Sequence, residues 1–330
     1  MMAAQNLIEI WRGDFLESQH RGHAVICNAS GGIVRAWGNP DLTILPRSSC
    51  KMIQALPLVL SGAAHARGLT SQQLALACAS HQGAAIHTDL VQRWLQDLGK
   101  TDDDLRCGPQ TPNDITTRDG LVKSDTSPCR YHNNCSGKHC GFLTLSDHLG
   151  AGPEYHNPDH PVQRAVKDMF EWATGETTPG FGIDGCSAPN FTCSITGLAR
   201  AAAKFAGAVD GGSAEDQAMV ALRNAMMAHP ELVAGQTRAC TELMQATPGV
   251  ALKTGAEAVF VAIIPAQQLG IAVKIEDGSF RASEAMIAAL LIDLGLLDAN
   301  HPNALRRVGG PIRNWDGLET GKTVIAPGVL

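Results

Sequence analysis

The sequence is poor in aromatic residues and contains no long apolar run. Phe, Trp and Tyr make up 5% of the 330 residues, whereas 34 residues are Gly. Small residues, mostly Ala and Gly, therefore fill much of the volume, which favours closely packed helices. No stretch of 18 consecutive apolar residues offers a candidate membrane span. The formal net charge is −6 and Lys and Arg are not clustered. We therefore expect neither nucleic acid nor an anionic membrane surface as a partner.

Neither a secretory signal nor a disulfide framework is expected. Residues 1–10 lack the basic start and the continuous apolar core of a signal peptide. The cysteines are too sparse for a disulfide scaffold and include no C-x-x-C pair. They are Cys27, Cys50, Cys78, Cys107, Cys129, Cys135, Cys140, Cys186, Cys193 and Cys240. We expect a cytoplasmic protein with reduced thiols, some of which can bind metal.

Several common catalytic motifs are absent as well. The chain has no H-E-x-x-H, no Walker loop and no G-x-S-x-G elbow. Residues 180–185 match G-x-G-x-x-G, but no strand pattern precedes them, and Pro189 follows where a nucleotide-binding loop needs a helix. We interpret the stretch as a tight loop that presents Asp184 and Cys186, with a plain turn as the alternative.

Two short motifs that are present occur together in serine acyl-transfer enzymes. They are S-x-x-K at Ser48-Ser49-Cys50-Lys51 and K-T-G at Lys253-Thr254-Gly255. If a helix opens at Ser48, the Lys51 amine lies on the same face of the helix and can reach the Ser48 hydroxyl. A neutral amine can accept the hydroxyl proton, and Lys253 could act as the second cation that keeps Lys51 neutral. S-x-x-K alone is better explained by a helix cap followed by a surface lysine. When S-x-x-K is considered together with K-T-G, the sequence supports the catalytic interpretation and the helix-cap interpretation about equally.

Ser80 and the polar stretch at residues 133–141 are two further candidate sites. Ser80 ends an Ala-rich helix pattern; it is either a buried helix-ending serine or the second serine that such sites use to relay a proton or bind substrate. Residues 133–141 are the densest reactive stretch, and Cys135 and Lys138 could face one point there. A thiolate with a second, distant Cys favours a soft metal, most plausibly zinc, although a cysteine spacing of five is not that of a standard finger. His139 stands out from the other histidines through its neighbours alone.

The order of elements predicts an α+β fold. Apolar, β-rich runs at 7–11, 23–28, 33–37, 259–264, 269–274 and 323–326 predict strands, and 101–134 reads as a long irregular loop. A helix should begin near Ser48 and run to about residue 60, with Pro57 starting or kinking part of it. Further helices are expected at 71–79, 88–98, 137–149, 160–174, 191–206, 214–228, 231–246 and 282–297. The N- and C-terminal strands would form one antiparallel sheet with packed helices and a helical lobe. We predict a single domain over 1–330, with a sheet part at about 1–47 and 250–330 and a mainly helical part at about 48–249.

The motifs together resemble a known family. The blocks at 45–51, 78–81, 133–139, 184–186 and 253–257 look like those of the Rhizobium etli-type, or class 3, L-asparaginases, also called the asparaginase II domain family. The resemblance spans about residues 7–330. It implies a fold similar to serine β-lactamases and Ser–Lys glutaminases. It also implies hydrolysis of L-asparagine to L-aspartate and ammonia, as in asparagine catabolism, by a homodimer.

The resemblance also assigns roles to residues. Ser48 with Lys51 and Ser80 with Lys253 would form two adjacent Ser–Lys pairs. The zinc ligands would be Cys135, Lys138 and Cys186. Substrate binding would fall to Arg47, Asn134, His139 and Asp184. The chain departs from the family at Ala258, where Gly is usual, and at Cys129 and Cys140, which the family does not lead us to expect.

The resulting hypothesis is a Ser–Lys amidohydrolase. Ser48, or alternatively Ser80, attacks the side-chain amide, Lys51 accepts the proton, and an acyl-enzyme is hydrolysed by water. Zinc orients the substrate's α-amino or carboxylate group and is not strictly required for the chemistry. One rival is a penicillin-recognising serine hydrolase or esterase, against which stands the absence of an S-D-N triplet. The other rival is a non-catalytic, zinc-stabilised binding protein.

Overall fold

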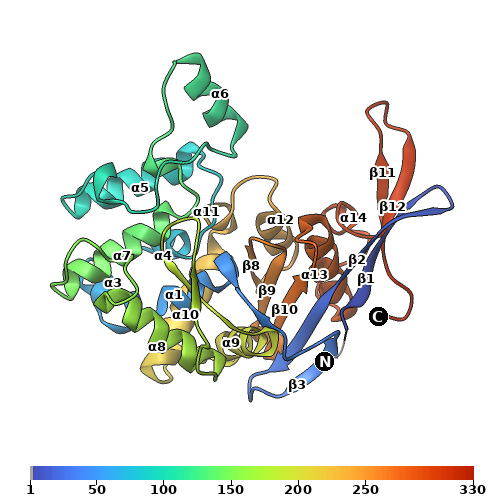
Figure 1. Ribbon diagram of the computed structural model, residues 1–330, viewed down its shortest axis with the longest axis horizontal. Helices are drawn as coiled ribbons and strands as arrows, with labels where there is room; N and C mark the ends of the chain where they lie inside the picture. Colours follow the sequence, from blue (N-terminus) through green and yellow to red (C-terminus); the bar gives the residue numbers. More distant parts are fainter. Residues whose placement is uncertain (1–2) are drawn as a thin grey trace. The chain divides into compact units, whose positions relative to one another are not determined.

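The two ends of the chain build one antiparallel sheet (Figure 1). The computed structural model describes residues 3–330, which form two compact units, and the sheet unit comprises residues 3–49, 193–207 and 242–330. The strand order is β11 (Pro311–Arg313), β12 (Glu319–Ile325), β1 (Gln5–Arg12), β2 (Phe15–Asn28), β10 (Leu269–Ile275), β9 (Val259–Ile264) and β8 (Ala251–Gly255). Apart from it, β4 (Thr43–Ile44) pairs with β7 (Cys193–Ser194). The expected α+β architecture, with a sheet made from both chain ends, is confirmed.

Strand β2 links the two halves of this sheet. It is 14 residues long and pairs with β1 over its first half, from Phe15 opposite Arg12 to Gly22 opposite Gln5. Its second half pairs with β3 (Ile33–Trp37) on one side and with β10 on the other. Strands β8 and β9 are buried along their whole length. The continuous apolar run of β9 predicts this burial, whereas β8, which contains Lys253 and Thr254, is not among the strands that the sequence predicts.

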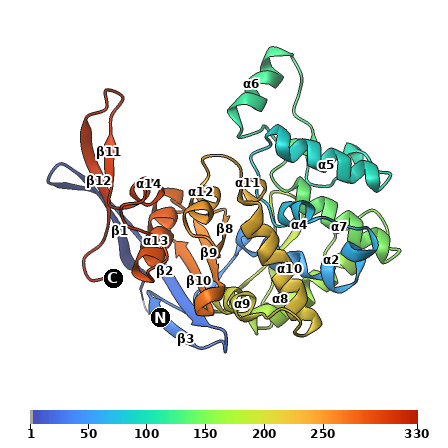
Figure 2. The same cartoon turned by 180° about the vertical axis from the view of Figure 1, so that it is seen from behind.

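Two helices cover the sheet. The Ala-rich α9 (Ile195–Gly207) packs against β2, β9 and β10, and α13 (Phe280–Asp293) packs against β1, β9, β10 and β12 (Figure 2). The short elements η4 (Pro265–Gln267) and α14 (Pro302–Leu305) lie in the connections. Small side chains on α9 let it approach the strands closely, and this is how a chain with few aromatic residues fills its core.

The second unit, residues 50–192 and 208–241, is helical. Its helices are α1 (Lys51–Gln54), α2 (Leu56–Leu60), α3 (Ala63–Ala66), α4 (Ser71–Ala77), α5 (Ala85–Asp97), α6 (Ile115–Lys123), α7 (Ser136–His148), α8 (Pro161–Thr174), α10 (Ala214–Ala228) and α11 (Pro230–Val233). Its short elements are η2 (Asp102–Asp104), η3 (Arg130–His132), β5 (Phe181–Ile183) and β6 (Pro189–Phe191). Helix α12 (Ala239–Ala246) and the turn η1 (Arg47–Cys50) contain the boundaries with the sheet unit.

Helix α7 is the centre of the helical unit. Its residues from Ser136 to Ser146 are all buried, and it packs against α2, α3, α4, α5 and α8. The sequence fixes the starts of the surrounding helices: Thr70 and Gln73 form a capping box on α4, and Pro161 opens α8. Helix α6 differs, because it buries no residue and projects past α5 in both views (Figures 1 and 2).

The structure corrects several predicted elements. The helix expected over 231–246 is two helices, because Gly235 and Thr237, with φ of 110° and 64°, take left-handed conformations that no α-helix accommodates. The helix expected over 191–206 begins only at Ile195, after β6 and β7. The loop over 101–134 contains α6 and two 3-10 turns. The helix expected from Ser48 to about residue 60 is a 3-10 turn, η1, followed by the short helices α1 and α2, which are separated at Ala55. Pro57 is the second residue of α2, so it starts part of this stretch, as predicted.

Candidate functional site

The S-x-x-K motif begins in a tight turn of the sheet unit. Arg47, at the start of η1, has φ of 54°, a left-handed conformation that a non-glycine residue adopts at a cost of about 1–2 kcal/mol. Ser49 donates to Pro46 O twice, from its backbone nitrogen at 3.2 Å and from its hydroxyl at 2.7 Å. Ser48 is half-buried on this turn, and the chain runs on directly into α1, which begins at Lys51.

The K-T-G strand packs on the same turn. Lys253, in β8, is fully buried, and its Nζ donates to Thr254 O at 2.7 Å. A Cβ at Gly255 would lie 2.6 Å from Pro46 O and 2.9 Å from Ser49 N, so only glycine allows this approach. The structure therefore brings the end of K-T-G against the backbone of the turn that carries Ser48, as the pairing of the two motifs predicts.

In the helical unit, Lys51 joins two parts of the candidate site. Its side chain is 1% exposed, and its Nζ donates to Ala79 O and, at 3.1 Å, to Cys135 Sγ. Ala79 precedes Ser80, whose backbone nitrogen donates to Val233 O at 2.9 Å. The sequence pairs Lys51 with Ser48 alone, because nothing in the spacing of residues 51 and 135 indicates a contact.

Cys135, Lys138 and Cys186 form a buried cluster. Lys138 Nζ donates to Cys186 Sγ at 3.0 Å, and the two thiols are hydrogen-bonded to each other. Asn134 Oδ1 lies 2.9 Å from Cys135 Sγ. All three residues of the cluster are at most 4% exposed. The three side chains that the resemblance assigns to the metal thus converge on one point.

The charges in this cluster are coupled. The hydrogen bond with Cys135 and the positive charge of Lys138 hold the pKa of Cys186 well below that of an ordinary thiol, although burial opposes them. The same hydrogen bond, together with burial, raises the pKa of Cys135. Burial lowers the pKa of Lys138, but its interactions with the two cysteines, above all the charge of Cys186 and the hydrogen bond to it, outweigh burial, and the net shift is upward. One thiolate and one ammonium are the stable combination in the absence of a metal.

Local backbone structure sets the position of each member of the cluster. Cys135 is the N-cap of α7, and its backbone nitrogen donates to Asn133 Oδ1 at 2.9 Å. At Gly137 a Cβ would lie 2.4 Å from Leu76 O, so the first turn of α7 presses directly on the end of α4. Cys186 lies in the loop of the β5–β6 hairpin. The stretch that matches G-x-G-x-x-G, residues 180–185, forms the first strand of this hairpin and the start of its loop. The predicted tight loop that presents Asp184 and Cys186 is therefore present.

The donor set of the cluster fits a zinc ion. Zinc binds thiolate sulfur and neutral nitrogen in tetrahedral sites, and two sulfurs with one amine leave a fourth position open. A thiolate at Cys186 is the ligand form, whereas Lys138 must lose its proton when a metal binds. No group of three or more His, Cys, Asp or Glu side chains that could hold a metal occurs within residues 3–330.

The residues assigned to substrate lie in different places. Asn134 and Asp184 belong to the turn before α7 and to the β5–β6 loop, and Arg47 lies on the Ser48 turn. His139 lies in the core of the helical unit, fully buried, with its Nδ1 2.9 Å from the Tyr155 hydroxyl oxygen. Burial holds the pKa of His139 well below its ordinary value. The His139 ring is therefore neutral.

Three further thiols, at Cys107, Cys129 and Cys140, have no role in the sequence-based hypothesis. Cys107 is buried close enough to Cys135 and Cys186 for their charges to add to the effect of burial, which raises its pKa. Cys140 is fully buried within α7. Cys129 is half-exposed, and its Sγ lies 3.2 Å from His132 Nδ1. No sequence signal distinguishes Cys107 from the other cysteines.

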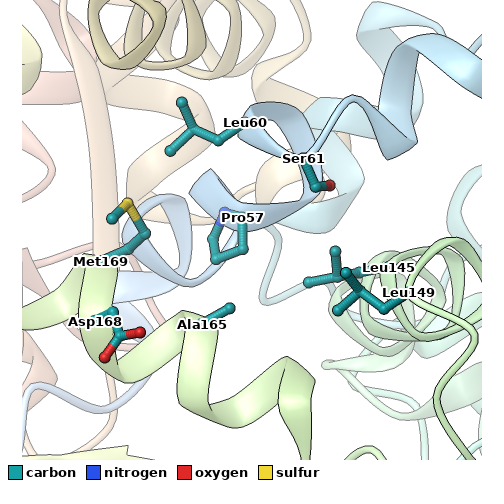
Figure 3. A pocket seen from close by; sticks show the side chains of 8 residues that line it. All are labelled: Pro57, Leu60, Ser61, Leu145, Leu149, Ala165, Asp168 and Met169. Carbon is teal, nitrogen blue, oxygen red and sulfur yellow. The ribbon is translucent and has the colours of Figure 1, made fainter.

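A separate groove in the helical unit lies between α2, α7 and α8 (Figure 3). Its volume is about 270 Å³. The lining residues are Pro57, Leu60, Ser61, Leu145, Leu149, Ala165, Asp168 and Met169. The lining is apolar apart from the Ser61 hydroxyl and Asp168, which lie on opposite sides of the groove (Figure 3).

Comparison with known proteins identifies relatives of the chain. Residues 8–325 match the model of the family described as L-asparaginase II. Among solved structures, the chain is similar to Mglu in its native form, with 14% identity, a TM-score of 0.48, and coverage of 90% of this chain and 69% of that chain. It is also similar to a β-lactamase from Mycobacterium bovis, with 13% identity, a TM-score of 0.43, and coverage of 82% and 94%. No protein of curated function matches the chain.

Proposed function

The chain belongs to the L-asparaginase II family, and on that premise we propose that it hydrolyses L-asparagine to L-aspartate and ammonia by Ser–Lys acyl transfer. The observation that carries the proposal is the position of Lys51. This buried amine follows Ser48 at the spacing of one helical turn, touches the carbonyl before Ser80 and touches Cys135. One candidate base thus follows Ser48 by three residues and lies beside the Ser80 turn and the thiol cluster.

In the proposed reaction Ser48 is the nucleophile. Its Oγ bonds to the side-chain amide carbon of asparagine while Lys51, as the neutral amine, takes the hydroxyl proton. The C–N bond then breaks, Lys51 returns the proton to the leaving nitrogen, and ammonia departs. Water, deprotonated by Lys51, attacks the ester carbon, the bond to Ser48 Oγ breaks, and Lys51 returns the proton to that oxygen as aspartate departs. Backbone N–H groups near the nucleophile hold the oxyanion, each worth roughly 3 kcal/mol. Ser80 with Lys253 is the second pair, and Ser80 is the alternative nucleophile.

Cys135, Lys138 and Cys186 are the residues that would hold a zinc ion in this proposal. When bound, zinc would supply a positive charge that orients the α-amino or carboxylate group of the substrate. Asn134, whose Oδ1 lies 2.9 Å from Cys135 Sγ, borders this proposed zinc site. Arg47, Asp184 and His139 complete the proposed substrate set. The proposed assembly is a homodimer, which light scattering tests.

The test is ammonia release from L-asparagine and from L-glutamine, with and without prior chelator treatment. We expect release from asparagine, loss of that release in Ser48→Ala, and a raised KM after chelation. Release from neither amide, combined with hydrolysis of a chromogenic β-lactam, would instead favour a penicillin-recognising hydrolase. No hydrolysis of any of these substrates, with Ser48→Ala and Ser80→Ala changing thermal stability alone, would indicate a binding protein.

A further inference from the structure

His81 joins two turns of the helical unit, and the proposed reaction leaves it without a role. It lies directly after Ser80, and its backbone nitrogen donates to Asn134 O at 3.2 Å. Its Nε2 lies 2.9 Å from the hydroxyl oxygen of Ser136, the residue after Cys135. The side chains of His81 and Ser136 are both buried, at 1% and 0% exposure. A contact between buried polar groups at this position needs an explanation.

The hydrogen bonds determine the tautomer of the ring. The Ser136 hydroxyl has one hydrogen, which it donates to Tyr131 O at 3.0 Å. His81 Nε2 therefore carries the proton and donates it to Ser136 Oγ. Nδ1 is the acceptor and receives the backbone N–H of Gly83 at 3.2 Å. Both nitrogens of the neutral ring are thus satisfied, so His81 acts as a fixed donor and not as a proton carrier.

A second histidine fixes the plane of this ring. His87 stacks on His81 with ring centroids 4.8 Å apart and an interplanar angle of 10°. His87 Nε2 lies 2.9 Å from Glu231 O, to which it donates, and this bond holds the stack to α11. The His81 donor is therefore held in direction as well as in position.

We propose that His81 is a positioning residue, which through Ser136 holds the Ser80 turn against the first turn of α7, where Cys135 and Lys138 lie. The kinetic part of this inference rests on the proposed function. Lys51 contacts both sides of the connection, at Ala79 O and at Cys135 Sγ. Without the bond from His81 to Ser136 the two turns can move separately, and a displacement of about 1 Å at a catalytic site can cost about 100-fold in rate.

Two substitutions separate the roles of the ring nitrogens. In His81→Gln the amide nitrogen reaches the position of Nε2, so it can still donate to Ser136. In His81→Asn the amide reaches only the position of Nδ1, so the acceptor for Gly83 is kept and the donor to Ser136 is lost. We expect kcat on asparagine to fall about 10- to 100-fold in His81→Asn and in Ser136→Ala, and to stay within about threefold in His81→Gln.

A double-variant cycle tests whether the two residues act as one unit. Combining His81→Asn with Ser136→Ala should cost no more than the worse single variant, because both remove the same bond. His148→Gln is the matched control, since it alters a surface imidazole that donates to Ser61 O. Losses that multiply in the double variant, or a Gln variant as slow as the Asn variant, would overturn the proposal.

Hydrogen exchange gives a readout that does not depend on the reaction. In His81→Asn the amides of residues 80–83 and of residues 134–137 should both exchange faster than in the wild type and in His81→Gln. If the wild type releases no ammonia from any amide, the proposed function fails while exchange still decides the role of His81. Faster exchange confined to residues 80–83 would show that His81 does not hold α7.

Discussion

Replacement of Gly255 by alanine tests the contact between K-T-G and the Ser48 turn. The added Cβ would lie 2.6 Å from Pro46 O, whereas close carbon–oxygen contacts begin at about 3.3 Å. The turn or the strand must therefore move by roughly 0.7 Å. Neither partner can yield by rotating a side chain, because both the oxygen and the nitrogen of Ser49, 2.9 Å away, belong to the backbone.

The displacement sets the expected magnitude. Forced expansion of a packed interior costs typically about 1–3 kcal/mol of unfolding free energy. A displacement of about 1 Å at a catalytic site can cost about 100-fold in rate. The shift of roughly 0.7 Å expected at the turn of Ser48, the proposed nucleophile, should therefore lower kcat roughly 10- to 100-fold. KM should change less, because the residues proposed to bind substrate and zinc, other than Arg47, lie in the helical unit.

Ammonia release and urea denaturation measure the two effects. Gly152→Ala is the control, because a Cβ there meets nothing within 4 Å and its backbone is not left-handed. We expect the control to keep both kcat and the denaturation midpoint. A Gly255→Ala protein with kcat within about twofold of wild type would refute the view that this strand positions the Ser48 turn.

Three further predictions concern single side chains. Lys51→Met should lower kcat for ammonia release by about 100- to 10,000-fold, and a loss of less than about tenfold would remove Lys51 as the base. Cys135→Ala should lose zinc in elemental analysis and raise KM, whereas Cys27→Ala, a buried cysteine of β2, should do neither; unchanged zinc and KM in Cys135→Ala contradict the metal role. Burial lowers the pKa of His23 in the folded protein. As the pH falls below about 6.5, the unfolded chain therefore binds a proton at this imidazole before the folded chain does, and the free energy of unfolding decreases. In His23→Asn the amide oxygen can replace Nδ1 as the acceptor for Asn39 N, which lies 2.8 Å from Nδ1 in the wild type. The unfolding free energy of this variant should fall less between about pH 7 and pH 5.5 than that of the wild type. An equal fall in the two proteins would contradict the assignment to His23.

The sequence predicts those parts of the site that depend on local pattern. The spacing of S-x-x-K and the break in the G-x-G-x-x-G stretch correspond to a turn and a hairpin in the structure. K-T-G packs against the Ser48 turn as expected, but the strand β8 that contains it is not among the predicted strands. Continuous apolar runs such as Val259–Ile264 identify buried strands for the same reason. These features follow from the chemistry of neighbouring residues along the chain.

Other features depend on contacts between distant segments, which no spacing encodes. The bond from Lys51 to Cys135 joins residues that lie 84 positions apart. The break before α12 depends on Thr237 in a left-handed conformation, which threonine does not favour and which the surrounding structure must impose. His81 stands beside Ser80 in the sequence, but nothing in the spacing of residues 81 and 136 indicates that its ring contacts Ser136.

Helix α6 has a consequence for how this protein can vary. Nine residues that bury nothing contribute little to the core, and Ile115 and Val122 are 63% and 76% exposed on it. Insertions and deletions are tolerated where few buried contacts are broken. Length differences among relatives should therefore accumulate between α5 and η3, and a tag or a foreign loop placed at Gly120 should leave the fold intact. The same segment offers the best place to attach this protein to a carrier.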